Sequence, residues 1–216
     1  MKGLTERQLK RRERILAAAR KLITDRGYDG LTMRDLAAES GVAPKTLYHQ
    51  FHSKENLLRL AVEERYRYLY QIIDDEQIEH GIDRLFFIID TVASTTENNL
   101  AYAKALRPLL TSETSSTFAA IRMNTYRKAI DQIEAEGEIV DWIDVDILAA
   151  VVYRQVNPIY LAPWYKETPW ATVARIAKLD ICLILAAVTT GYTQTTAEKT
   201  IRDLQKQLKR SGSRYI

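Results

Sequence analysis

The chain has 216 residues, of which 46% are hydrophobic and 27% are charged, and its formal net charge is +3. These values are typical of an ordinary soluble protein with one or two domains. The single cysteine, Cys182, excludes a disulfide framework. The first twenty residues lack the apolar core of a secretory signal, and the longest apolar block, 181–188, is too short to cross a bilayer. We therefore expect a cytoplasmic protein without a membrane partner.

The segment 31–54 contains two short helical patterns separated by a glycine. The first begins at Thr32, a good N-cap residue, and Asp35 suits the positive end of a helix. Gly41 is expected to end this helix because glycine adopts positive φ without a steric cost. Pro44 suits the first turn of the next helix, where its missing N–H would have no partner. Two short helices in this order predict a helix-turn-helix.

The second short helix is expected over 44–50, with Leu47 and the following Phe51 directed inward. Its outer side then carries residues that can contact base edges and phosphates, namely Lys45, Thr46, Tyr48 and His49. Ser53 is expected to cap the helix that follows. Lys54 in the first turn of that helix opposes the helix dipole, and a bound phosphate would remove this objection.

Positive charge is concentrated around this motif. Residues 1–60 contain thirteen Lys or Arg against seven Asp or Glu, a net +6, whereas the remaining residues have a net charge of −3. Binding to a polyanion requires such a concentration. A small helical hairpin with a solvated face of mixed charge would show the same spacing, so the motif by itself leaves both interpretations open.

Residues 12–58 resemble the DNA-binding domain of the tetracycline-repressor (TetR) family. The matching elements are Ile15-Leu16, Gly27-Tyr28, Gly30-Leu31-Thr32, Leu36-Ala37, Gly41-Val42, Thr46-Leu47-Tyr48 and Phe51-x-Ser53-Lys54. The resemblance implies phosphate or base contacts from Thr32, Arg34, Pro44, Lys45, Thr46, Tyr48, His49 and Lys54. Lys45 is the best candidate for base readout, since a lysine can reach guanine O6 and N7. Many relatives have a small residue there, so an operator preference does not carry over.

The periodicity beyond the motif predicts helices throughout, so the expected fold class is all-α. We expect an N-terminal three-helix helix-turn-helix DNA-binding domain over 1–54 and a helical ligand-binding, regulatory and dimerisation domain over 55–216. The expected helices cover 53–79, 82–98, 99–110, 117–136, 143–165, 169–190 and 195–210. The first of these would direct Ile72 and Ile73 inward and would belong to both domains, as a lever between them.

The helices expected over 143–165 and 169–190 are apolar around more of their circumference than one core face explains. Either a third helix of the same chain covers them, or a second copy does so in a four-helix interface. The resemblance favours a homodimer, in which two recognition helices about 34 Å apart would match successive major grooves of a palindromic operator. The candidate interface residues are Ile147, Val151, Ile159, Ile176, Ile181, Ile184 and Val188.

Aromatic and polar residues are scattered over the middle helices, and the resemblance implies a small-molecule pocket there without defining its ligand. The candidates are Tyr66, Tyr70, Phe87, Tyr102, Arg107, Tyr126, Tyr153 and Arg154, with the two arginines as possible anchors for an anion. Each of these residues is equally compatible with an ordinary core or surface position.

Catalysis finds little support in the sequence. The three histidines do not form a metal site with thiols or carboxylates, and no glycine-rich phosphate loop or nucleophile motif occurs. We expect no enzyme activity, no cofactor and no metal. The sequence predicts a homodimeric transcriptional regulator, foremost a repressor that a small-molecule effector releases from its operator. The alternatives are a ligand-independent activator or architectural DNA-binding protein, and a helical module without DNA binding.

Overall fold

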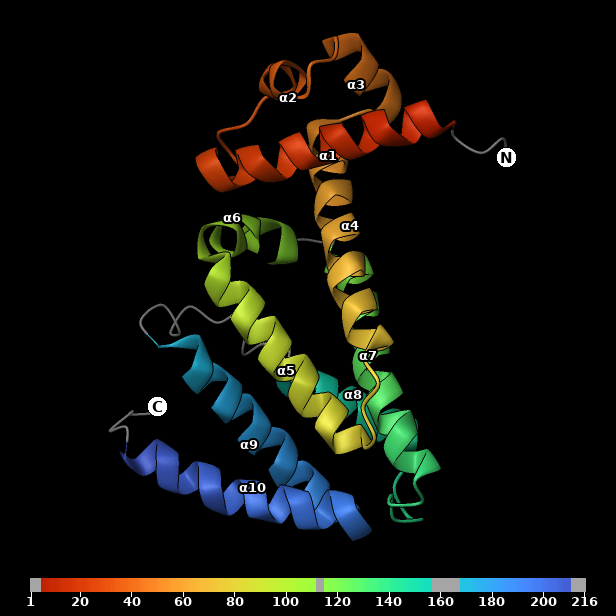
Figure 1. Ribbon diagram of the computed structural model, residues 1–216, viewed down its shortest axis with the longest axis vertical. Coiled ribbons are helices and arrows are strands. Elements are labelled where there is room, and N and C mark those ends of the chain that lie inside the picture. The colour runs from red at the N-terminus through yellow and green to blue at the C-terminus, as the bar shows by residue number, and fades with distance from the viewer. Residues whose placement is uncertain (1–4, 112–114, 157–167, 211–216) are drawn as a thin grey trace. The chain divides into compact units, whose positions relative to one another are not determined.

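The computed structural model describes residues 5–111, 115–156 and 168–210, and the side chains of 106–111, 115–117 and 210 lie outside this description. Within these ranges the chain is helical (Figure 1), in agreement with the predicted all-α class. The helices are α1 (Glu6–Arg26), α2 (Met33–Ser40), α3 (Pro44–Phe51), α4 (Lys54–Asp75), α5 (Gly81–Asn98), α6 (Leu100–Thr111), α7 (Ser115–Ala135), α8 (Val145–Val156), α9 (Trp170–Val188) and α10 (Gly191–Arg210). An isolated antiparallel bridge joins Ile139 and Thr189.

The observed helices follow the predicted ranges closely. Two helix ends and the orientation of one side chain differ from the prediction. The helix expected to reach residue 79 ends at Asp75. Gly191, expected to end a helix, is instead the first residue of α10, and α9 ends at Val188. Ile72, expected to point inward, is 45% exposed, whereas Ile73 is fully buried. The last part of the helix expected over 143–165 lies outside the described residues.

The chain forms two compact units. The first consists of residues 1–69 and 99–119, and the second consists of residues 70–98 and 120–216. The boundary between the units along the chain therefore falls within α4, between α5 and α6, and within α7. The predicted functional division at residue 54 is a different one, and it stays a prediction.

The first unit is built around α1. Its apolar face buries Ile15, Leu16 and Ala19 completely. Arg20 of the same helix donates to the carbonyl of Ala61 and to Glu64 on α4, at 3.4 and 3.2 Å. Helices α2 and α6 also pack against α1. The helix-turn-helix segment therefore packs against the long helix α1 (Figure 1).

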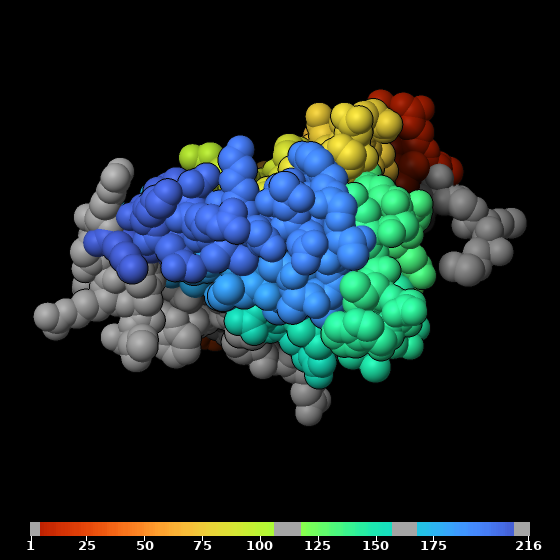
Figure 2. All heavy atoms as spheres, turned by 90° about the horizontal axis from the view of Figure 1, so that it is seen from below, coloured from red at the N-terminus to blue at the C-terminus, as the bar shows by residue number. Residues whose placement is uncertain are grey.

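The second unit is built around α9, which packs against α5, α8 and α10. Its residues Val173, Ala177, Ile181 and Leu185 are fully buried. Figure 2 shows α10 (blue) along one face of this unit, with the green residues that follow α7 beside its amino-terminal end. Helix α9 thus has neighbours from its own chain on several sides.

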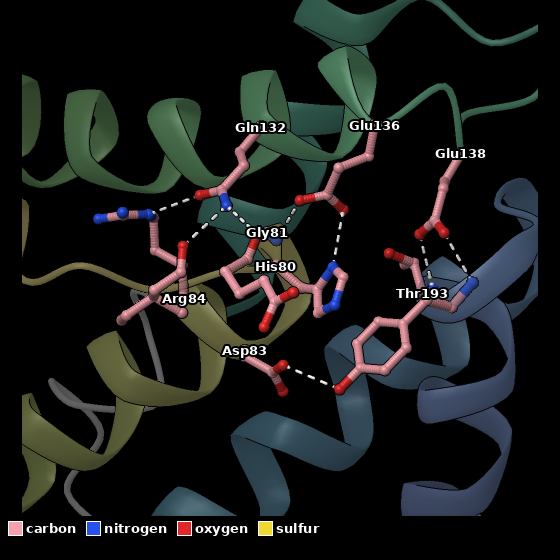
Figure 3. Close-up of polar contacts among 11 residues, drawn as sticks. His80, Gly81, Asp83, Arg84, Gln132, Glu136, Glu138 and Thr193 are labelled. Carbon is pink, nitrogen blue, oxygen red and sulfur yellow. Dashed lines mark hydrogen bonds and ion pairs between the residues drawn. The ribbon is translucent and has the colours of Figure 1, made fainter.

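Side chains from α7 and the segment after it hold the starts of two other helices (Figure 3). Gln132 donates to the carbonyls of Ile78 and Glu79, just before α5, at 3.0 and 2.9 Å. Glu136 accepts the N–H of Gly81 at 2.9 Å. Glu138 accepts the N–H groups of Tyr192 and Thr193 in the first turn of α10, both at 2.7 Å. Carboxylates are well placed there because the amino-terminal end of a helix is positive.

Candidate nucleic-acid interface

A reciprocal cap defines the start of α2. The Thr32 hydroxyl accepts the N–H of Asp35 at 3.2 Å, and the Asp35 carboxylate accepts the N–H of Thr32 at 3.0 Å. The hydrogen bond from the Thr32 hydroxyl, followed by that from its backbone, holds the pKa of Asp35 below its usual value. Arg26 at the end of α1 also pairs with Asp35 at 3.1 Å. The expected cap is confirmed, and the ion pair between Arg26 and Asp35 links α2 to α1.

The turn between α2 and α3 has the predicted geometry. Gly41 lies in the left-handed region, with φ 63° and ψ 39°, and its N–H donates to carbonyls of the last turn of α2. Ala43 is extended, and Pro44 then occupies the first position of α3. These features confirm the helix-turn-helix expected from the sequence.

Helix α3 has one buried side and one open side. Leu47 and Phe51 are completely buried, and they fix the orientation of the helix on the first unit. Pro44, Lys45, Tyr48 and His49 are exposed on the open side, and Thr46 is half-buried. Tyr48 keeps 53% of its surface exposed. The backbone and two apolar anchors thus present a row of hydrogen-bonding side chains to solvent.

Two predicted contact residues lie at the start of α2, and both Thr32 and Arg34 are exposed. Lys45 and Arg34 make no hydrogen bond or ion pair within the described part of the chain, so their charges are available to an external anion. The predicted contact residues therefore all belong to the first unit. Their roles in DNA binding stay a prediction.

Lys54 has a protein contact that the sequence did not indicate. Ser53 caps α4 as expected, because its hydroxyl accepts the N–H of Asn56 at 3.1 Å. The Nζ of Lys54 lies 5.1 Å from the centre of the Tyr28 ring, within the range of a cation–π interaction. A phosphate is therefore not required to explain a cation at this helix start, although Lys54 remains half-exposed.

The end of α3 was not anticipated in detail. His52 has a positive φ of 66°, which is uncommon for a residue with a side chain, and its N–H donates to the carbonyl of Tyr48 at 2.9 Å. Asn56 Nδ2 donates to the carbonyl of Phe51 at 2.9 Å. The His52 side chain is exposed at the end of α3, and it was not in the predicted set.

The candidate ligand residues are divided between the two units. In the first unit, the rings of Tyr66 and Phe118 lie 5.6 Å apart, and burial raises the pKa of the half-buried Tyr102. The backbone of Arg107 belongs to α6, and its side chain lies outside the described residues.

In the second unit, Tyr70 and Tyr126 are buried and Phe87 is half-buried. The ring of Tyr126 lies 6.1 Å from that of Tyr153, whose buried hydroxyl has no hydrogen-bond partner in the described part of the chain. Arg154 is exposed and donates to the carbonyl of Ala150 on its own helix.

Sequence reasoning passed over Arg122, one helical turn before Tyr126 on α7. This cation is only 9% exposed. Arg122 and Tyr126 are four residues apart and therefore lie on one side of α7. This spacing was the pattern in the sequence that could have pointed to Arg122. The structure thus joins Tyr126, Tyr153 and a buried arginine within one unit.

The candidate interface residues differ in exposure. Ile147 is 57% exposed, and Val151, Ile176 and Ile184 are half-buried. Ile181 and Val188 are buried inside the second unit at 0% and 8% exposure, so they have little surface for a partner. Ile159 lies outside the described residues. Leu183, which was not selected, is 53% exposed on α9.

No helix among the described residues is both long enough and apolar enough to traverse a membrane. The same residues contain no cluster of three or more His, Cys, Asp or Glu side chains that could bind a metal ion. Burial raises the pKa of the Cys182 thiol to about 12, so this thiol is neutral at physiological pH.

Residues 15–61 match the family model described as bacterial regulatory proteins of the tetR family. The HTH-type transcriptional regulator UidR of Escherichia coli K12 is 29% identical over 86 residues, which are 39% of this chain and only 42% of UidR. The HTH-type transcriptional repressor KstR2 of Mycolicibacterium smegmatis is 23% identical over 200 residues, covering 88% of this chain and 94% of KstR2.

A similar fold occurs in the transcriptional regulator FadR of Bacillus subtilis, whose structure was solved in complex with stearoyl-CoA. The TM-score is 0.63 at 17% identity, and the likeness covers 76% of this chain and 94% of FadR. These similar proteins are transcriptional regulators and not enzymes. The match over 15–61 and the observed helix-turn-helix together show that this segment is that of the tetR family of bacterial regulatory proteins, and the rest of the chain shares the fold of such regulators.

Proposed function

We propose that the protein is a homodimeric transcriptional repressor that binds a palindromic DNA operator through α3. The observation that carries this proposal is the open face of α3, where Lys45, Tyr48 and His49 are exposed while Leu47 and Phe51 hold the helix from behind. A recognition helix needs such an arrangement, because its outer side chains must reach base edges in the major groove. Repression, as opposed to activation, is supported by the name of KstR2, a transcriptional repressor.

The DNA-binding step can be tested with duplexes selected from a random-sequence library by the wild-type protein. Replacing Lys45 and Tyr48 together by alanine should lower the affinity for the selected duplex by about 30-fold or more, since each good base contact contributes about 1–3 kcal/mol and two are removed. The matched control is the double variant Tyr68→Ala and Lys104→Ala, which removes the same two side-chain types from exposed positions of α4 and α6.

The control should bind like wild type, and both variants should keep the wild-type circular dichroism spectrum. Equal affinities of the recognition-helix variant and wild type at fixed salt would rule out α3 as the reading element. Failure of the wild-type protein to enrich any sequence would rule out the proposed function itself.

The second copy in the proposed dimer would contact exposed apolar residues of α8 and α9. Ile147 and Leu183 are more than half exposed, and Val151, Ile176 and Ile184 are partly exposed beside them along these helices. Burying such side chains favours association by about 1.5–3 kcal/mol for each residue fully covered. We expect Leu183→Glu to shift the protein towards the monomer in sedimentation velocity, whereas Leu9→Glu, at an equally exposed leucine of α1, should not.

The proposed effector would bind in the second unit near Tyr126 and Tyr153. The buried Tyr153 hydroxyl without a described partner supports this, because enclosed polar groups are normally hydrogen-bonded. The buried cation of Arg122 suits an acidic group on the effector. Such a ligand can release DNA only if it binds the released conformation better than the DNA-bound one.

Stearoyl-CoA is a reasonable first probe, because FadR was solved with that ligand. It would be screened beside free fatty acids, aromatic acids and neutral analogues for compounds that weaken operator binding. Tyr153→Phe should weaken the response to an active compound, while Tyr68→Phe, at an exposed site, should leave it unchanged. If no compound in a broad screen alters DNA affinity, a ligand-independent DNA-binding protein becomes the better description.

A further inference from the structure

The first turns of α1 carry a stripe of three arginines, Arg7, Arg11 and Arg14. Their spacing of four and then three residues places them on one side of the helix. All three are exposed. Within the described part of the chain, none of them has a hydrogen bond, an ion pair or an aromatic contact. We call these three residues the α1 stripe.

Several other cations of the first unit are neutralised by a neighbouring carboxylate. Lys10 pairs with Glu6 at 2.7 Å and Lys21 with Glu39 at 2.6 Å. Arg59 and Arg67 share Glu63, at 2.7 and 2.9 Å. The arginines of the α1 stripe have no such partner within the described part of the chain, and in this they resemble Arg34 and Lys45 of the helix-turn-helix.

The stripe is unfavourable for α1 as an isolated helix. Like charges three and four residues apart repel each other on a helix surface. Arg7 also lies in the first turn of α1, where a cation opposes the helix dipole. An external anion that lies along the stripe would remove both penalties, and a polyanion would do so for all three arginines.

The side of α1 that carries the stripe also carries a residue that reaches the helix-turn-helix. Lys21 follows Arg14 by seven residues on the same side of α1, and it reaches Glu39 of α2. On another side of α1, between Arg11 and Arg14 along the chain, the guanidinium of Arg12 lies 5.4 Å from the ring centre of Phe51, the last residue of α3, so α3 lies near this part of α1. Figure 1 shows the amino-terminal part of α1 beside α3 in this unit.

We propose that the α1 stripe binds backbone phosphates of duplex DNA next to the site that α3 occupies. The inference rests on the DNA-binding function proposed above and extends its contact surface to a second helix. Arginine suits this role because its planar guanidinium donates to phosphate oxygens in pairs. Phosphate contacts contribute affinity and register and no sequence preference, so the stripe strengthens binding to every duplex alike.

The test compares the triple variant R7Q/R11Q/R14Q with the control K199Q/K206Q/K209Q. Each removes three unpaired, exposed positive charges, from α1 in the first unit and from α10 in the second, within the described part of the chain. Glutamine keeps a good helix propensity, so both variants should retain the wild-type circular dichroism spectrum. Affinity is measured from about 0.05 to 0.3 M salt, both for a duplex selected by the wild-type protein and for a scrambled duplex.

In the stripe variant, the slope of log K against log salt should become shallower by about 0.9 for each phosphate that the protein no longer neutralises. Affinities for the selected and scrambled duplexes should fall together, by about tenfold or more at 0.1 M salt, so that their ratio stays constant. The control should keep the wild-type slope. This pattern differs from that of the Lys45 and Tyr48 variant, in which the ratio itself should fall.

A wild-type slope in the stripe variant would overturn the inference while leaving the proposed function intact. Equal decreases in affinity in the stripe variant and the control would also overturn it, since they would reflect net charge alone. Absence of specific binding by the wild-type protein would instead refute the proposed function.

Discussion

In the first unit α2 and α4 are capped by near neighbours, whereas in the second unit distant residues hold the starts of α5 and α10. Thr32 and Asp35 cap α2 across three positions, and Ser53 caps α4 through Asn56. In the second unit, Glu138 caps α10 from 54 and 55 residues away. The starts of α2 and α4 thus depend on local signals, as does that of α8, where Asp144 accepts the N–H of Ile147, whereas the starts of α5 and α10 depend on how the chain packs.

Two glycines sharpen this comparison and should produce the largest effects. An added Cβ at Gly81 would lie 2.5 Å from the carbonyl oxygen of Ala129 and from Ile133 Cγ1, a clash with distant residues. Gly41 has a φ of 63° and nothing within 4 Å of such a Cβ, so its requirement is local. We expect Gly81→Ala to cost about 1–3 kcal/mol through overpacking, and Gly41→Ala to cost about 1–2 kcal/mol through backbone strain.

Asparagine separates the two causes, and urea unfolding provides the measurement. Asparagine tolerates the left-handed region, so Gly41→Asn should recover part of the stability that Gly41→Ala removes. At Gly81 the larger side chain should be worse than alanine. A recovery at Gly81, or none at Gly41, would contradict the distinction between local and distant constraints.

The local cap of α2 should have an intermediate effect. Thr32→Ala removes the hydroxyl that accepts the N–H of Asp35, and we expect a decrease of about 1 kcal/mol in the free energy of unfolding. Thr32→Ser keeps the acceptor and should stay close to wild type. Hydrogen exchange of the α2 amides is the sharper measurement, because faster exchange should begin at the first turn of α2. Equal protection in the alanine and serine variants would show that the cap does not stabilise this helix.

The distant cap of α10 should have the smallest effect and a distinct pH dependence. Burial alone would raise the pKa of Glu138, but the hydrogen bonds from Thr193 and Tyr192 hold that pKa below its usual value. Its ionised form therefore stabilises the fold above the unfolded pKa of about 4.3, and this contribution disappears as the pH falls through the lower folded pKa.

Glu138→Gln removes the charge, and we expect a decrease in stability of at most about 1 kcal/mol at pH 7 because the carboxylate is partly exposed. The difference between wild type and variant in urea unfolding should shrink as the pH falls below about 4.3. A difference that stays constant down to about pH 3 would show that the ionised carboxylate does not stabilise α10.

The exposed and buried positions of the second unit illustrate what helical periodicity leaves open. Periodicity predicted apolar helices over 143–165 and 169–190, and α8 and α9 lie within these ranges, but it did not show which apolar residues the chain itself covers. Ile181 is buried by neighbouring helices, whereas Leu183, two positions later, is more than half exposed. Both are apolar, so only the placement of α5, α8 and α10 around α9 distinguishes them.

The helix-turn-helix shows the opposite case. Thr32, Gly41 and Pro44 act within one turn of their own positions, through hydrogen bonds and backbone angles that belong to the residue type. Their effects are therefore readable in the sequence, and α2, its turn and α3 were predicted to within about a residue. The contact of Lys54 with Tyr28 was not readable, because it joins residues 26 positions apart.

The sequence by itself determined the all-α class, the helix-turn-helix and the residues on the open side of α3, because caps, glycines and apolar periodicity act over a few residues. Tertiary structure alone decided that Glu138 caps α10, that α5 approaches α7 at Gly81, and that Ile181 is enclosed. The physical reason is the separation along the chain between the residues that interact. These contacts form between helices that meet only after the chain has folded, and their energies depend on distances that no local pattern encodes.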